Sequence, residues 1–372
     1  MRPRMRDYGR PMQTMPRDLL LVGSIPLSSA EEVFRTCAAT VGDLVDCLPD
    51  GEYDERIWWV NQQAWRVFHP HPDITTLKRP RPIDGVEQWK PVSVEDYWKF
   101  KLDDGVTELR FDNLTYADAA IASYGDFRRL RDEKVISRDV RFQVCVPMTN
   151  SAIDCFFDDP DEYPILNAAY EDAMRREIER MVEQIPPEDL VIQWDCCVEI
   201  LDVEGLFPWT PAEGKFERNV EPFGHVTPAI PERVLVGFHF CYGTLGGWPM
   251  LPPTDLALCV RMANEAVRRA GRRVDYVHMP APRKAGDAFF APLQHLEIGD
   301  TKVFLGIIHH TEGTDPTLFA RRARAASRYL PEYGISGVCG YGRVEDPMHD
   351  VLVGHRANVE ALHEMGEKSS RV

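Results

Sequence analysis

A histidine and a cysteine lie two residues apart where an apolar run ends, in the second half of the chain. His239 and Cys241 follow the apolar segment 234–238, and side chains two residues apart in a strand point to the same face. A third candidate, Cys339, ends another apolar run just before a glycine. One nitrogen and two sulfurs suit Zn²⁺ with an open coordination position for a substrate. The alternative is that all three are packed core residues, because free cysteine is among the most buried residue types.

The fourth ligand of such a site is open. His278 is the best candidate by position, because it lies at the end of the next apolar run. Glu312, His309 and a water molecule are the alternatives. A free thiol has a pKa of about 8.5, and a coordinating metal removes its proton outright. The predicted chemistry is therefore the activation of a thiol for attack on an electrophilic carbon.

Eight short apolar runs alternate with amphipathic segments, a pattern typical of βα units around a parallel sheet. The predicted strands are 19–25, 43–48, 140–146, 190–195, 233–240, 273–279, 302–309 and 335–339. The predicted helices are 29–41, 163–184, 254–270, 316–329 and 350–365. A length of 372 residues suits one such barrel with insertions. We therefore predict an α/β fold, a TIM (β/α)8 barrel with long loop insertions.

Local signals predict where two of the helices begin and end. Ser28 or Ser29, followed by two glutamates, resembles a capping arrangement, and Thr254 resembles another helix start. Gly271 is typical of a helix stop.

Two segments interrupt the alternation of strands and helices. Segment 70–105 contains five prolines and is predicted to be a long excursion over the barrel surface, followed by an extra strand at 107–111. Segment 203–231 is rich in proline, glycine and aromatic residues, and loops of this length are usually lids or binding loops. Residues 1–18 are predicted to be a flexible arm, and 19–372 a single barrel domain.

Polar side chains at strand ends are the other candidates, because the active site of such a barrel forms at the C-terminal ends of its strands. Asp50 and Glu52 follow the second run, Asp195 ends the fourth and His309 ends the seventh. We expect Glu52, Asp195 and His309 to act in catalysis, and Asp50, Glu52 and Asp195 to contact substrate. The alternatives are a helix-capping turn at Asp50 and Glu52, a structural carboxylate at Asp195 and a packed His309.

Four tryptophans could enclose a substrate at this end of the barrel. Trp58, Trp59 and Trp65 follow the second run, and Trp248 lies in a glycine-rich loop after Cys241. The alternative for each is ordinary packing.

Composition excludes several classes of protein. A net charge of −16, from 43 basic and 59 acidic residues, would repel nucleic acid and anionic lipid. Nine scattered cysteines do not form a secreted disulfide framework, and no apolar leader precedes them. The longest apolar runs are strand-sized, so no membrane span is expected. We predict a cytoplasmic protein without nucleic-acid or membrane partners that could form a homo-oligomer.

Five of these strand ends resemble those of the cobalamin-independent methionine synthases and their relatives among the uroporphyrinogen decarboxylase-like barrels. In chain order, the resemblance rests on Gly23-Ser24-Ile25-Pro26 for the family's Gly-Ser-Phe-Pro, Asp50-Gly51-Glu52 for His-Gly-Glu, Gln193-Trp194-Asp195 for Gln-Ile-Asp, His239-Phe240-Cys241-Tyr242 for His-Met-Cys-Tyr, and Cys339-Gly340 for Cys-Gly. Val338 stands where the last motif of the family has an aspartate.

The resemblance implies zinc held by His239, Cys241, Cys339 and a glutamate, with a thiol substrate entering as a further ligand. It also implies that Glu52 and Asp195 bind the amino group of homocysteine, and it places Ser24 at the substrate.

This sequence departs from the family in two ways. The family's Ile-Glu-x-x-Arg pattern would place its glutamate at Pro280, which cannot coordinate, although His278 could substitute. The folate-using members also carry a second barrel, for which this chain has no room. In length it resembles the short archaeal-type synthases and the zinc-dependent alkyl-thiol transferases.

We therefore predict a zinc-dependent transferase that moves a methyl or other alkyl group to a homocysteine-like thiol. Its expected partners are the small-molecule thiol and an alkyl donor, neither of which the sequence identifies. The alternative functions are a lyase or decarboxylase that uses the strand-end acids and histidines in acid–base catalysis, and a non-catalytic small-molecule binder.

Overall fold

Eight parallel strands form a nearly closed barrel in the computed structural model, which describes residues 17–369. In chain order they are β1 (Leu19–Leu20), β2 (Cys47–Pro49), β5 (Arg141–Pro147), β6 (Leu190–Cys196), β7 (Leu235–Phe240), β8 (Tyr276–Pro280), β9 (Lys302–Ile308) and β10 (Gly334–Gly337). Strand β1 pairs with β10, and Leu19 bridges to Val45 ahead of β2, which brings the two edges of the sheet together. The predicted TIM-like barrel is confirmed, and each of its eight strands overlaps a predicted run, although β2, β5, β6, β8 and β10 each extend one residue beyond it.

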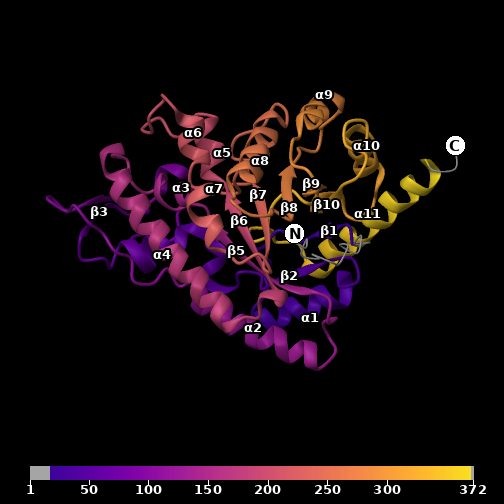
Figure 1. The fold of residues 1–372 in the computed structure, drawn as a ribbon, viewed down its shortest axis with the longest axis horizontal. Helices are drawn as coiled ribbons and strands as arrows, with labels where there is room; N and C mark the ends of the chain where they lie inside the picture. The colour runs from indigo at the N-terminus through magenta and orange to yellow at the C-terminus, as the bar shows by residue number, and fades with distance from the viewer. Residues whose placement is uncertain (1–16, 370–372) are drawn as a thin grey trace, which may run out of the picture.

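Helices surround the strands on the outside of the barrel (Figure 1). They are α1 (Ala30–Val41), α2 (Tyr116–Asp132), α3 (Thr149–Ile153), α4 (Tyr163–Gln184), α5 (Val198–Val203), α6 (Lys215–Val220), α7 (Phe223–Val226), α8 (Ala257–Arg269), α9 (Asp287–Phe290), α10 (Thr317–Ala326) and α11 (Met348–Ser369). No helix in the described part of the chain has both the length and the apolar character needed to cross a bilayer.

The predicted helix boundaries differ in accuracy. Ser29 caps α1 by accepting a hydrogen bond from the Glu32 backbone N–H, as predicted. The predicted start at Thr254 is wrong by three residues, because the Asp255 carboxylate accepts from the Ala257 backbone N–H and α8 begins there. Gly271 has a φ of 64°, a left-handed conformation that suits glycine after a helix, so the predicted stop is confirmed.

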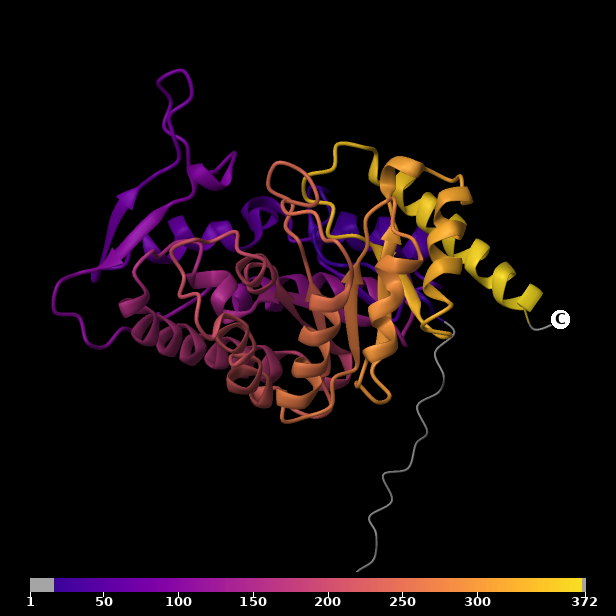
Figure 2. The same ribbon diagram turned by 90° about the horizontal axis from the view of Figure 1, so that it is seen from above.

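The first insertion contains an antiparallel hairpin that the sequence did not predict. Its strands are β3 (Ile74–Lys78) and β4 (Lys99–Leu102), and the hairpin projects from the barrel in Figure 2. The extra strand predicted at 107–111 is wrong, because that segment has no regular structure. Helix α2, which follows it, was not predicted either.

Buried side chains replace the sheet ladder beyond the two-residue strand β1. Gln143 Nε2 donates to the carbonyls of Leu21 and Val22 at 3.1 Å, and Gln193 Nε2 donates to the Val22 carbonyl at 2.7 Å. The Tyr276 hydroxyl donates to Gln193 Oε1 at 2.9 Å. These bonds satisfy backbone groups that would otherwise be buried without partners, and they fix the chain that leads to Ser24.

Only the end of the predicted N-terminal arm lies within the described residues. The Asp18 carbonyl accepts from the Ile335 backbone N–H, and Arg17 Nη1 donates to the Val45 carbonyl at 3.0 Å. Residues 1–16 lie outside the described part of the chain.

Candidate metal centre

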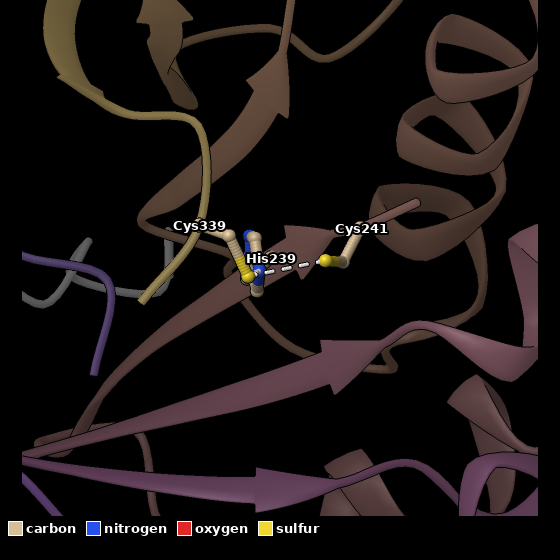
Figure 3. Close-up of side chains that lie close together, drawn as sticks. All are labelled: His239, Cys241 and Cys339. Carbon is tan, nitrogen blue, oxygen red and sulfur yellow. Dashed lines mark hydrogen bonds between the residues drawn. The ribbon is translucent and has the colours of Figure 1, made fainter. Parts of the chain in front are cut away.

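The three soft ligands predicted from the sequence converge at the C-terminal end of the barrel. His239 lies near the end of β7, Cys241 directly follows that strand, and Cys339 follows β10. Each offers one ligand atom, and these atoms lie within 4.8 Å of one another. Figure 3 shows the three side chains pointing toward a common centre. Strands β7 and β10, which are not paired with each other, thus bring an imidazole and two thiols together.

The spacing and chemistry of this group fit zinc. Bonds of about 2.3 Å to sulfur and about 2.0–2.1 Å to nitrogen separate tetrahedral ligands by about 3.8 Å between sulfurs and about 3.6 Å between sulfur and nitrogen. The Cys339 Sγ to His239 Nε2 distance is 3.6 Å, and the Cys241 Sγ to Cys339 Sγ distance is 3.2 Å. The two thiols are free, since a disulfide bond is only about 2.05 Å long.

His278 lies behind His239, on the side away from the two thiols. The two rings approach through their Nδ1 atoms at 2.7 Å, and His278 Nε2 lies 3.0 Å from the Gly337 carbonyl oxygen. Burial lowers the pKa of His278 to about 4. Burial, and to a smaller extent the neighbouring His278, lowers the pKa of His239 well below its usual value. Both rings are therefore neutral at pH 7.

This chain of contacts determines the tautomer of His239. Because a carbonyl only accepts, His278 Nε2 carries the proton and its Nδ1 is an acceptor. His239 must then donate from Nδ1, which leaves its Nε2 lone pair directed at Cys339. Such an outer hydrogen bond to a metal-ligating histidine is common in metal sites. The predicted ligand His278 is thus placed to orient His239.

The protein surroundings alone favour the protonated form of both thiols. Thiol neighbours and burial raise the pKa of Cys241 and of Cys339 well above the usual value, with Cys197 the largest influence on Cys241. The Gly243 backbone N–H donates to Cys241 Sγ at 3.3 Å and acts in the opposite direction. The positive charge of a metal is therefore what would hold these side chains as thiolates.

A cavity of about 70 Å³ lies beside the three ligands. Of the residues predicted to contact substrate or act in catalysis, Ser24, Glu52 and Asp195 line it. The other lining residues are Val22, Gly23, Trp59, Asn61, Tyr97, Cys197, Gly243, Thr244, Leu245, Met250, Gly340 and Arg343, together with the three candidate ligands. One small space thus joins a soft metal site to two carboxyl groups.

Glu52 faces this cavity from a tight turn. Its carboxylate accepts a hydrogen bond from the Ser24 hydroxyl. Burial raises the pKa of Glu52 to about 7, and the neighbouring Asp50 adds to the effect. The backbone of Glu52 is left-handed, with a φ of 51°. This conformation is held by Asp50, whose Oδ1 accepts from the Glu52 backbone N–H at 2.9 Å.

Asp50 itself serves the turn and does not line the cavity. Its Oδ2 accepts from the Ser123 hydroxyl at 2.7 Å and lies 2.9 Å from Arg56 Nη2. With its oxygens engaged in this way, Asp50 supports Glu52, as the turn alternative for this residue supposed.

Asp195 is the second carboxyl group of the cavity. Burial and the nearby Glu52 raise its pKa well above the usual value, while the hydrogen bond from Gln193 Nε2 at 2.8 Å opposes the shift. Two buried carboxyl groups with raised pKa values that line one cavity favour a cation beside them. An ammonium group is therefore the kind of substrate group that suits this end of the cavity.

Besides Asp50 and His278, five predicted residues lie outside the cavity lining: Trp58, Trp65, Trp248, His309 and Glu312. Trp248 packs edge-on against His309, with ring centroids 6.0 Å apart, and His309 Nε2 lies 3.1 Å from the Ala281 carbonyl oxygen. Glu312 forms a buried ion pair with Arg322, whose Nη1 lies 3.0 Å from Glu312 Oε1. Glu312 is thus engaged by Arg322, and His309 and Trp248 pack against each other outside the cavity lining.

Sequence reasoning missed several lining residues. Among them are Cys197, Asn61 and Tyr97. Nothing in the local sequence marks Asn61, which lies in the segment after β2, or Tyr97, which the first insertion brings to the cavity. Cys197 carried a usable signal, since it directly follows β6, which contains Asp195.

No protein-family description and no curated protein matches this sequence. The structure is similar to a B12-independent methionine synthase from Shewanella sp. W3-18-1, solved in complex with selenomethionine, at 12% identity over 95% of this chain and 99% of that one, with a TM-score of 0.60. It is also similar to a putative vitamin-B12 independent methionine synthase from Listeria monocytogenes, at 14% identity over 89% and 86% of the two chains and a TM-score of 0.52. The chain therefore has the fold of the cobalamin-independent methionine synthase barrels, as the resemblance of its strand ends predicted.

Proposed function

We propose that this protein is a zinc-dependent transferase that moves a methyl or other alkyl group to the thiol of a homocysteine-like acceptor. The observation that carries the proposal is the convergence of one imidazole and two thiols within 4.8 Å, beside a cavity lined by two buried carboxyl groups. The fold it shares with methionine synthases supports the same assignment.

His239, Cys241 and Cys339 would hold the metal. Zinc bound there would supply the positive charge that keeps a neighbouring thiol deprotonated at neutral pH. His278 keeps the Nε2 lone pair of His239 directed at the centre, through the 2.7 Å contact between the two Nδ1 atoms. The protein therefore needs to supply position and a water-poor pocket, because effective positioning contributes a large part of the barrier reduction in such reactions.

Glu52 and Asp195 would bind the amino group of the acceptor. Both carboxyl groups line the cavity with the candidate ligands. An ammonium group between them would lower the pKa of each and so release the proton that burial favours. The acceptor would be held at its amino end by the carboxyl groups and at its thiol by the metal centre.

Metal content tests the first part of this proposal. Protein expressed in zinc-replete medium should contain stoichiometric zinc, and Cys241→Ser and Cys339→Ser should lose it while keeping the wild-type far-UV circular dichroism. Cys259→Ser is the matched control, because Cys259 is also buried but contacts the Tyr242 hydroxyl away from the cavity. Full zinc content in both ligand variants, or a wild-type protein unable to take up zinc, would contradict the assignment.

Acceptor binding tests the second part. Cobalt(II) replaces zinc in many thiolate sites and reports each added thiolate through its absorption spectrum. Homocysteine should change the spectrum of the cobalt protein and homoserine should not. The same thiol acid without the amino group should bind to the wild type more weakly than homocysteine does. It should also bind to Glu52→Gln as strongly as it binds to the wild type. A Glu52→Gln variant that binds homocysteine with wild-type affinity would rule out the amino-group role.

One observation favours a second candidate, a lyase that works by acid–base catalysis. Glu52 has a pKa of about 7 and Asp195 a pKa raised well above normal, which are values suited to proton transfer. Activity of zinc-free protein on a carboxylated substrate, with no spectral response to thiols, would favour the lyase.

A further inference from the structure

Cys197 reaches the metal centre through the register of two neighbouring strands. In the parallel pair β6–β7, Asp195 lies opposite His239 and Cys196 opposite Phe240. The Cys241 backbone N–H donates to the Cys196 carbonyl at 3.1 Å, which continues the pairing past the end of the strands. Cys197 and Cys241 are therefore the next neighbours, on chains that lie about 4.8 Å apart in a sheet.

The side chain of Cys197 is directed into the same space as the candidate ligands. It lines the cavity together with His239, Cys241 and Cys339. Cys196, the preceding residue, is fully buried and does not line the cavity. Two adjacent cysteines thus have different surroundings, and only one has access to the centre.

Cys197 is also held in place by its backbone. The Ser151 hydroxyl oxygen accepts from the backbone N–H groups of Cys197 and Val198, at 3.2 and 3.1 Å. Ser151 in turn donates to the buried carboxylate of Glu199 at 2.5 Å. A fixed backbone lowers the entropic cost of coordination, since only the rotation of the thiol remains to be set.

Three other residues considered for the fourth position either have no atom that can bind a metal or already use their polar atoms in hydrogen bonds or an ion pair. Pro280 has no ligating atom, and both nitrogens of His278 have partners at 2.7 and 3.0 Å. Glu312 is paired with the buried Arg322.

We propose that Cys197 is the fourth protein ligand of the metal centre, giving a site of three thiolates and one imidazole. This inference rests on the proposed zinc function. On coordination the Cys197 S–H bond is lost, its proton passes to solvent and one metal–sulfur bond forms. Zinc commonly takes such a Cys₃His ligand set. Since four protein ligands fill a tetrahedron, an incoming thiol must replace one of them or expand the coordination shell.

X-ray absorption at the zinc edge of the substrate-free protein tests the ligand set. The wild type should show three sulfurs at about 2.3 Å and one nitrogen, and Cys197→Ser should show two sulfurs with lighter atoms in the remaining positions. Cys196→Ser is the control and should match the wild type. Zinc affinity of Cys197→Ser should fall by more than about 100-fold, beyond the loss usual for outer-shell changes.

A second measurement on the wild type avoids any folding defect of the variant. Zinc should slow the alkylation of Cys197 by N-ethylmaleimide, measured by peptide mass spectrometry, to the extent expected for Cys241 and Cys339. Two sulfurs in the wild-type spectrum, or equal alkylation of Cys197 with and without zinc, would overturn the inference while leaving the zinc function standing. A wild-type protein without zinc would instead overturn the proposed function.

Discussion

Replacing His278 by leucine tests whether this residue orients His239, the histidine proposed to bind the metal. His278→Leu removes the acceptor that lies 2.7 Å from His239 Nδ1 and the donor that lies 3.0 Å from the Gly337 carbonyl oxygen. Leucine is of similar size, so the change leaves little empty space. Without its acceptor, the His239 proton can move to Nε2, where it blocks coordination.

The expected loss follows from these contacts. A buried N–H group left without an acceptor costs about 1–3 kcal/mol, and removing an outer-shell partner of a metal ligand costs about 10–100-fold in affinity. The second range corresponds to about 1.4–2.8 kcal/mol. The two estimates agree, so zinc should bind His278→Leu about 10–100-fold more weakly.

Competition with a chromophoric zinc chelator would measure this affinity. The matched control is His309→Leu, because His309 is also buried, also bonds a carbonyl, at 3.1 Å, and also has a pKa lowered to about 4 by burial. Both variants should lose stability, but only His278→Leu should lose zinc affinity. Equal affinities for the two variants would refute the orienting role.

Three further predictions concern stability. Burial raises the Glu52 pKa from 4.5 to about 7, so the native state keeps a proton that the unfolded chain releases in this range, and the wild-type free energy of unfolding should fall by up to about 3 kcal/mol from pH 4.5 to 7. In urea denaturation at these pH values, the fall for Glu52→Gln should be smaller by that amount. A fall equal to that of the wild type would contradict the pKa. A Cβ atom on Gly306 would lie 2.7 Å from His278 Nε2 and 2.9 Å from the Gly337 carbonyl oxygen, so Gly306→Ala should cost about 1–3 kcal/mol and weaken zinc binding. Its control, Gly125→Ala in α2, meets nothing within 4 Å and should stabilise by about 0.5–1 kcal/mol; thermal denaturation that ranks the two in the opposite order would disprove the packing argument. Glu312→Gln leaves the charge of the buried Arg322 uncompensated and should cost about 3–5 kcal/mol in chemical denaturation, and a loss below about 1 kcal/mol would show that solvent reaches the pair.

Much of the barrel could be predicted because its strands are apolar runs that repeat between helices. The ends of those runs also located His239, Cys241 and Cys339 correctly in space relative to one another. The length of a strand was harder to predict from the sequence. Strand β1 ends at Leu20, although the predicted run continues to Ile25. The reason is that Gln143 and Gln193 satisfy the following backbone groups, and these contacts are far apart in sequence.

The insertion between β2 and β5 could not be predicted in detail. Prolines suggested an irregular excursion, but Pro80, Pro82 and Pro91 lie in the loop of the hairpin and leave its strands free to pair. Helix α2 has no side-chain hydrogen bond at its cap, and Thr115 adopts a left-handed φ of 71° there, so the usual start signal is missing.

The proximity of Cys197 to Cys241 has a different cause. It depends on the pairing register of β6 and β7, which one sequence does not specify. The tautomer of His239 was equally inaccessible, since it depends on a carbonyl of β10.

The segment after the first strand of the barrel contacts the segment after the last strand beside the cavity. The Ser24 carbonyl, which follows the first strand, accepts from the Tyr341 backbone N–H at 2.7 Å, two residues beyond Cys339. This bond holds the segment that carries Cys339 against the start of the barrel, so the candidate ligand set is fully formed in the closed barrel. A metal that binds only this closed form would stabilise it by about 4 kcal/mol at a free concentration 1,000 times its dissociation constant. Metal supply would then control how long the barrel stays closed, and so the lifetime of the folded protein, independently of turnover.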